Sequence, residues 1–148
     1  MKINIKRSDC KFIVKPEDKM VICIIDRYNG EGLKYTLLDF IRMEAPSSVD
    51  LYPYSKLMEK LEMPTSFIGK AVCSPDDEWN EEIGKKIAYS RAKNKFYTSF
   101  YKRANIYVQA VDNALNNLIT KFNDLGAALE ENKKKLDEEI EPYLAEKE

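Results

Sequence analysis

The sequence predicts an α+β fold, with an N-terminal antiparallel sheet of about four strands followed by two long C-terminal helices. Two observations carry this prediction. Residues 1–74 contain short runs of β-branched and aromatic residues between turn signals, whereas residues 75–148 carry apolar residues at helical spacing. The composition, 44% hydrophobic and 33% charged over 148 residues, is typical of one globular domain. We therefore expect a single domain, residues 1–148, with a β-rich part and a helical part.

The β-rich part contains several runs with strand character. The run Met20–Tyr28 is apolar on both faces at its start, which predicts the central strand. Asn29–Gly32 has the residues of a hairpin turn. A short helix is expected over 54–63, where Pro64 follows the apolar positions. The other expected strands are 1–7, 10–15 (a separate strand, or the first continued past a bulge), 33–43 and 66–73.

The helical part opens at Asn80, a good N-cap followed by two glutamates that suit the positive end of the helix dipole. Residues 80–125 form one helix or two. Gly126 either costs about 1 kcal/mol inside a continuous helix or marks a corner between two antiparallel helices. Steps of four and three residues then connect Val111, Leu115, Leu118, Phe122, Leu125, Leu129, Asn132 and Leu136.

Such 3-4 spacing keeps one apolar row on one side of a helix, as in bundles and coiled coils. The row packs either on the sheet of its own chain or on another copy. The predicted helices are long for the predicted sheet, so we expect a homo-oligomer that forms through the C-terminal helices.

Composition also excludes several functions. The chain has no histidine, which removes serine and cysteine triads that need an imidazole base and metal sites that need histidine. No glycine-rich phosphate-binding motif occurs. The cysteines, Cys10, Cys23 and Cys73, lack zinc or disulfide spacing. We expect no catalysis, no cofactor, no metal and no membrane association, and a cytoplasmic location, since neither a leader nor a long apolar run is present.

The net charge of −1 hides a strong segregation of charge. Residues 83–111 count to +7 and residues 129–148 count to −4. Because the basic segment is interleaved with aromatic residues, it has groups that attract phosphate and groups that stack on bases. Solvated lysines and packed aromatic rings are the alternative. The candidate ligand-binding residues are Arg27, Trp79, Arg91, Lys95, Tyr97 and Arg103.

One segment also resembles a known type of protein. Residues 69–92 show the pattern G-x-A-x-C-x-P-x-D-x-aromatic, then G-x-x-I-A-x-x-R-A. This strand–turn–helix corner is similar to one in small phage-borne α+β proteins, some likened to double-stranded-RNA-binding folds. It also resembles the phage anti-Thoeris proteins, which sequester cyclic ADP-ribose-type signals. The resemblance covers about 24 residues and implies an oligomeric binding site, in the host cytoplasm if the chain is phage-encoded.

Three functions follow as hypotheses. The first is a non-enzymatic protein that sequesters a small phosphorylated cyclic nucleotide, and that would act in counter-defence if the chain is phage-encoded. The second is a protein-binding inhibitor or adaptor of a host defence complex, acting through the acidic tail or the exposed helix face. The third is an RNA- or DNA-binding protein, for which binding would weaken steeply with salt.

Overall fold

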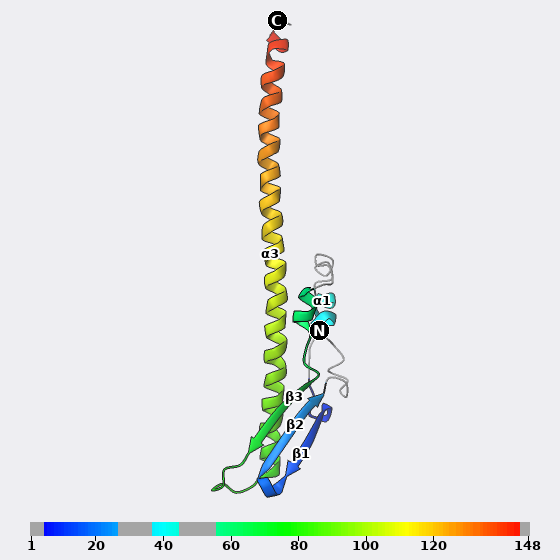
Figure 1. The fold of residues 1–148 in the computed structure, drawn as a ribbon, viewed down its shortest axis with the longest axis vertical. Coiled ribbons are helices and arrows are strands. Elements are labelled where there is room, and N and C mark those ends of the chain that lie inside the picture. Colours follow the sequence, from blue (N-terminus) through cyan, green and yellow to red (C-terminus); the bar gives the residue numbers. More distant parts are fainter. Residues whose placement is uncertain (1–4, 27–36, 45–55, 146–148) are drawn as a thin grey trace. The chain divides into compact units, whose positions relative to one another are not determined.

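The computed structural model describes residues 5–26, 37–44 and 56–145. It is an α+β structure in which a three-stranded antiparallel sheet precedes a long helix, α3 (Glu81–Ala145). The chain divides into two compact units, Met1–Val108 and Gln109–Glu148. The first unit holds the sheet and the beginning of α3 (Figure 1). The second contains the remainder of α3.

The sheet has the order β1-β2-β3, formed by Cys10–Lys15, Met20–Asp26 and Ser66–Val72. Strand β2 is central, as its apolar sequence predicted. Cys23 pairs with Phe12 of β1 and Gly69 of β3. Between β1 and β2, a 3-10 turn, η2 (Pro16–Asp18), ends at Lys19 with a left-handed φ of 46°. Pro16 suits the first position of this turn, because its ring fixes φ.

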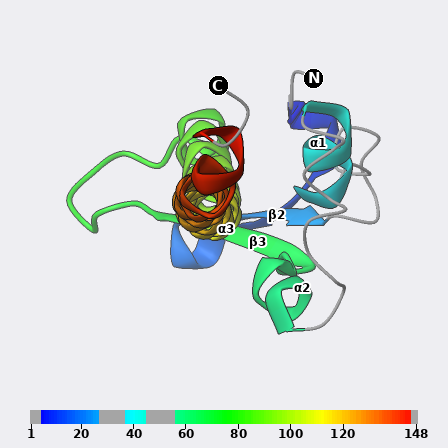
Figure 2. The same cartoon turned by 90° about the horizontal axis from the view of Figure 1, so that it is seen from above.

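The core of the first unit lies between one face of the sheet and the beginning of α3. The sheet and this part of the helix lie side by side in both views (Figures 1 and 2). Val21, Cys23 and Ile25 alternate along β2 and are fully buried. The helix meets them with small residues and then with rings: Gly84, Ala88, Ala92, Phe96 and Phe100 are buried four residues apart. Steps of four residues keep these side chains on one helix face.

The opposite sheet face carries apolar residues with Lys11, Lys15 and Lys70 among them. Met20, Ile22 and Ile24 of β2 are half-buried there. Their neighbours on β3 are more open, because Ile68 is 47% exposed and Val72 is 59% exposed. The alternation of β3 therefore places Phe67 and Ala71 in the core and leaves an apolar strip on the outside.

Several predictions of local structure were wrong. The expected strand 33–43 contains the helix α1 (Leu37–Glu44). Leu37 and Ile41 are both buried, and their spacing of four residues fits a helix, whereas Met43 is exposed. Of the expected strand 1–7, residues 1–4 lie outside the described residues, residues 5 and 6 form no strand, and Arg7 begins a 3-10 turn, η1 (Arg7–Asp9). The described residues thus hold three strands instead of about four. The expected hairpin turn at 29–32 lies outside the described residues.

The helical predictions were partly right. The short helix expected over 54–63 is α2 (Lys56–Leu61), with Leu61 buried. The two long helices are one, because α3 passes through Gly126 without interruption. No atom of another residue lies within 4 Å of a Cβ placed at Gly126, so the glycine serves no close packing there. The helix continues because its neighbours, Ala127 and Ala128 among them, favour helix.

Candidate functional site

Three of the predicted ligand-binding cations donate hydrogen bonds to main-chain carbonyl groups of residues 62–70. Arg91 Nη1 donates to Lys70 O at 2.6 Å, and Lys95 Nζ donates to Ile68 O at 2.7 Å. Arg103 Nε donates to Glu62 O at 2.6 Å, and its Nη1 reaches both oxygens of Ser99. The structure therefore assigns these cations a place along one segment of the chain.

The spacing of helix and strand explains the first two bonds. Residues four apart in an α-helix are separated by about 6 Å, and residues two apart in a strand by about 6.7 Å. The spacing between Arg91 and Lys95 on the helix therefore matches the spacing between Lys70 and Ile68 on the strand, and each cation reaches one carbonyl. These carbonyls belong to β3, an edge strand of the sheet. The two cations cover acceptors that an added strand would otherwise use.

Trp79, a fourth candidate, is half-buried and lines a cavity of about 310 Å³. The cavity lies between the end of β3, the loop 73–80 and the first turns of α3. Its apolar lining includes Val72, Ile83 and Ile87, and Asp77 and Glu78 are its charged lining residues. A flat ring in such a cavity is suited to stacking. The two carboxylates, however, disfavour a phosphate at the same place.

The remaining candidates are placed differently. Tyr97 is exposed on α3, and its ring makes an edge-on contact with the ring of Phe96, with 5.4 Å between the ring centroids. Arg27 lies outside the described residues. Neither Arg91 nor Arg103 lines the cavity beside Trp79. Sequence reasoning missed the open positions of Ile83 and Ile87, since helical spacing alone did not separate them from Ala88.

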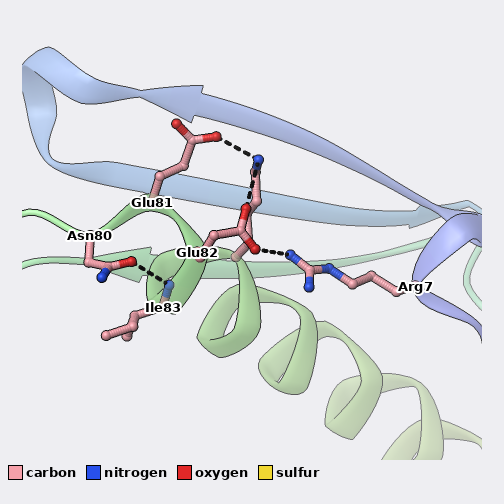
Figure 3. A network of polar contacts seen from close by, with 6 residues as sticks. Arg7, Asn80, Glu81, Glu82 and Ile83 are labelled. Carbon is pink, nitrogen blue, oxygen red and sulfur yellow. Dashed lines mark hydrogen bonds and ion pairs between the residues drawn. The ribbon is translucent and has the colours of Figure 1, made fainter.

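A polar network fixes the start of α3 (Figure 3). Asn80 Oδ1 accepts a hydrogen bond from Ile83 N at 3.1 Å, as the predicted N-cap requires. Arg7 of η1 donates to Glu82 at 3.1 Å, and this bond lowers the pKa of that carboxyl. Lys85 pairs with Glu81, which raises the pKa of the ammonium. Arg7, Glu81 and Glu82 are exposed, so the two ion pairs contribute little to stability.

The thiols of Cys10 and Cys23 are poorly reactive. Burial raises the pKa of Cys23 to about 12, and the neighbouring Cys10 adds to the rise. Burial also raises the pKa of Cys10, whose Sγ lies 3.5 Å from Lys6 O. A thiol with a raised pKa is a poor nucleophile at neutral pH. Among the residues that the structure describes, no three metal-binding side chains cluster.

The second unit has a different kind of surface. Its part of α3 carries a row of exposed apolar side chains, in which Leu115 is 51% and Phe122 71% exposed. We call this row the seam. It consists of the half-buried Val111, the exposed Leu115, Leu118, Phe122, Leu125, Leu129, Leu136 and Ile140, and one polar residue, Asn132. Isolated exposed leucines are ordinary, but a contiguous row of this length is typical of an interaction surface.

Comparison with known proteins adds no assignment. No protein-family model, curated protein or solved structure matches the chain. The described helices also contain no stretch with the length and apolarity needed to cross a bilayer. The fold and its surfaces define an α+β unit followed in sequence by a helical unit that carries the seam.

Proposed function

We propose that this protein is a non-enzymatic interaction protein that assembles through the seam of α3 and acts as an adaptor or inhibitor of another protein. The exposed apolar side chains of residues 111–140 are the observation that carries the proposal. An amphipathic helix gains stability when it buries such a row, at about 25 cal/mol for each Å² of apolar surface. A second helix fits this row best, because its spacing is that of knobs-into-holes packing.

The outer sheet face supports the adaptor role of the first unit. Ile68 and Val72 stand open beside half-buried Ile22 and Ile24. Lys70 lies between the two open residues on the same strand. Apolar groups bordered by charge are typical of protein-binding surfaces. Because Arg91 and Lys95 cover the β3 carbonyls, a partner would dock on this face of the sheet instead of adding a strand at that edge.

Light scattering after size-exclusion chromatography tests the assembly, and affinity capture from a bacterial lysate tests the partner. The variant Leu118→Glu/Phe122→Glu should have a lower assembled mass than the wild type. The variant Ile68→Glu/Val72→Glu should keep the wild-type mass but no longer capture the partner protein. Asn123→Glu is the matched control, since this residue lies on the same helix outside the seam. A wild-type chain that is monomeric and captures no protein would overturn the proposal.

Capture of a small phosphorylated cyclic nucleotide is a second candidate, favoured by the half-buried Trp79 beside a cavity of about 310 Å³. This volume lies at the lower end for ligand sites. The ring would stack on the base, and Arg91 would have to leave Lys70 O to meet a phosphate. Isothermal titration against cyclic ADP-ribose isomers and cyclic dinucleotides tests it. Heat that disappears in Trp79→Ala would support nucleotide capture, and no heat with any of them would remove it.

A further inference from the structure

We propose that a second copy of this chain covers the seam, in a parallel and in-register two-stranded coiled coil. The inference rests on the proposed assembly through α3 and adds its partner, orientation and register. It concerns residues 109–145 alone, which form one uninterrupted stretch of helix in the second unit.

The length of the seam is sufficient for a stable pair. From Val111 to Ile140 it spans 30 residues of sequence, or about 44 Å of helix. Its alternating steps of four and three residues run from Val111 to Leu136, or about three and a half heptads, which is the length at which a coiled coil becomes the expected structure. Writing the heptad from Leu115 at position a places Leu118 at position d. The other a positions are Phe122, Leu129 and Leu136, and the other d positions are Val111, Leu125 and Asn132.

Asn132 argues for a second copy in parallel orientation. Its side-chain amide needs both donors and acceptors, and the surrounding seam residues are apolar. In a parallel, in-register pair, position d meets position d, so Asn132 meets the same residue of the second copy and the two amides bond. At core position a, a buried asparagine specifies register and oligomeric state in coiled coils, at some cost in stability. We expect Asn132 to act in the same way at position d.

An antiparallel pair leaves this amide unsatisfied. There, position d faces position a, and the a positions of the seam are leucine or phenylalanine. Asn132 would then face an apolar side chain in every register within the seam. An unpaired polar group in a buried layer costs about 1–3 kcal/mol, and two copies would incur the cost twice. The polar layer therefore selects the parallel arrangement.

The charges of this segment permit the parallel pair. The acids at 130, 131, 137 and 138 fall at positions b and c, away from the seam. Within one chain, Lys133 pairs with Glu130 at 2.8 Å and Lys135 with Glu131 at 2.7 Å. The residues beside the seam that face each other across a parallel pair are Lys121 with Gly126 and Ala128 with Lys133. No like charges meet there.

The seam shifts at its C-terminal end. An unbroken heptad would put Glu139 in the core, and a parallel pair would then oppose two carboxylates. Ile140, one residue further on, is apolar, and at 41% exposure it is less exposed than Leu136 and Leu144. Successive steps of four residues, from Asn132 to Leu136 and on to Ile140, form a stutter that moves the seam to Ile140. The C-terminal end of the core therefore holds Ile140 in place of a carboxylate.

Cysteine cross-linking in the full-length chain tests the orientation. Leu118→Cys occupies a d position, so mild oxidation should give a covalent dimer in a parallel pair. Asn123→Cys, on the outer helix face, is the matched control, and the wild-type chain shows what the native cysteines contribute. A dimeric mass without cross-linking of Leu118→Cys would overturn the parallel orientation. A monomeric chain that still captures another protein would overturn the pairing with a second copy, but the proposed role as an interaction protein would stand.

The variant Asn132→Leu tests the polar layer. Replacing the asparagine by leucine should raise the denaturant midpoint of the pair but reduce the cross-linking of Leu118→Cys, because other orientations and larger oligomers become accessible. Asn123→Leu should change neither reading. Unchanged cross-linking and mass in Asn132→Leu would show that this residue does not set the orientation.

Discussion

The main chain of Gly69 in β3 lies so close to that of Ala88 in α3 that a Cβ atom on Gly69 would overlap the Ala88 carbonyl oxygen. The same atom would lie 2.5 Å from the amide nitrogen of Ala92. These neighbours are backbone atoms of a helix and cannot turn aside as a side chain can. This close approach also brings Arg91 and Lys95 within reach of the β3 carbonyls.

Gly69→Ala should therefore be strongly destabilising. The added methyl group forces the sheet away from α3, and overpacking of this kind costs about 3 kcal/mol or more. Urea unfolding followed by circular dichroism measures the loss. Gly126→Ala is the matched control, because its Cβ meets nothing within 4 Å, and it should raise stability by about 1 kcal/mol. Equal stability of Gly69→Ala and the wild type would contradict the close contact.

This corner was predictable because its signals are local. Gly69, Gly84 and Ala88 are small residues at the points of close approach, and Asn80 caps the helix. The strands β1 and β3 and the apolar β2 likewise follow from short patterns. The helix α1 was missed because alternation fits part of its sequence, and only the burial of both Leu37 and Ile41 distinguishes the helix. Tertiary packing decided between the two patterns.

The candidate site was less predictable for a physical reason. The sequence shows Arg91, Lys95 and Arg103 as cations near aromatic residues, but their acceptors are main-chain carbonyls. Every residue has a carbonyl group, so no residue type signals which ones are left unpaired at a sheet edge. The seam, in contrast, could be predicted from the sequence. The spacing of its apolar residues predicts both a helix and the helix face on which these residues lie.

Removing the cations from the β3 edge should promote association through that edge. In Arg91→Met/Lys95→Met, the carbonyls of Ile68 and Lys70 lose their donors, and an unprotected edge strand pairs with other chains. We expect faster aggregation on mild heating, measured by light scattering. Lys86→Met/Lys102→Met removes the same charge from the same helix and should aggregate at the wild-type rate. Equal aggregation of both double variants would exclude edge protection.

Asn80→Ala should destabilise the start of α3. The Asn80 side chain accepts from Ile83 N at 3.1 Å, and loss of an N-cap costs about 1 kcal/mol. Asn80→Asp should retain most of the stability, because its carboxylate also accepts this bond and suits the helix dipole. Chemical denaturation of the three proteins gives the comparison. A loss in Asn80→Asp as large as in Asn80→Ala would mean that the amide acts by another contact.

The buried thiol of Cys23 should make the protein sensitive to alkali. Burial, with a contribution from Cys10, raises the pKa of Cys23 from 9.0 to about 12. The unfolded chain therefore releases this proton at a lower pH than the folded protein does. The thiol's contribution to stability is complete below pH 9 and is lost as the pH rises towards 12.

The variant Cys23→Ala tests this effect, because it lacks this proton. Its free energy of unfolding should fall less than that of the wild type between pH 9 and 12, although tyrosines and lysines titrate in both proteins. Unfolding curves below pH 9 and between pH 9 and 12 measure the difference. Parallel losses in the two proteins would show that Cys23 ionises as readily in the folded chain as in the unfolded one.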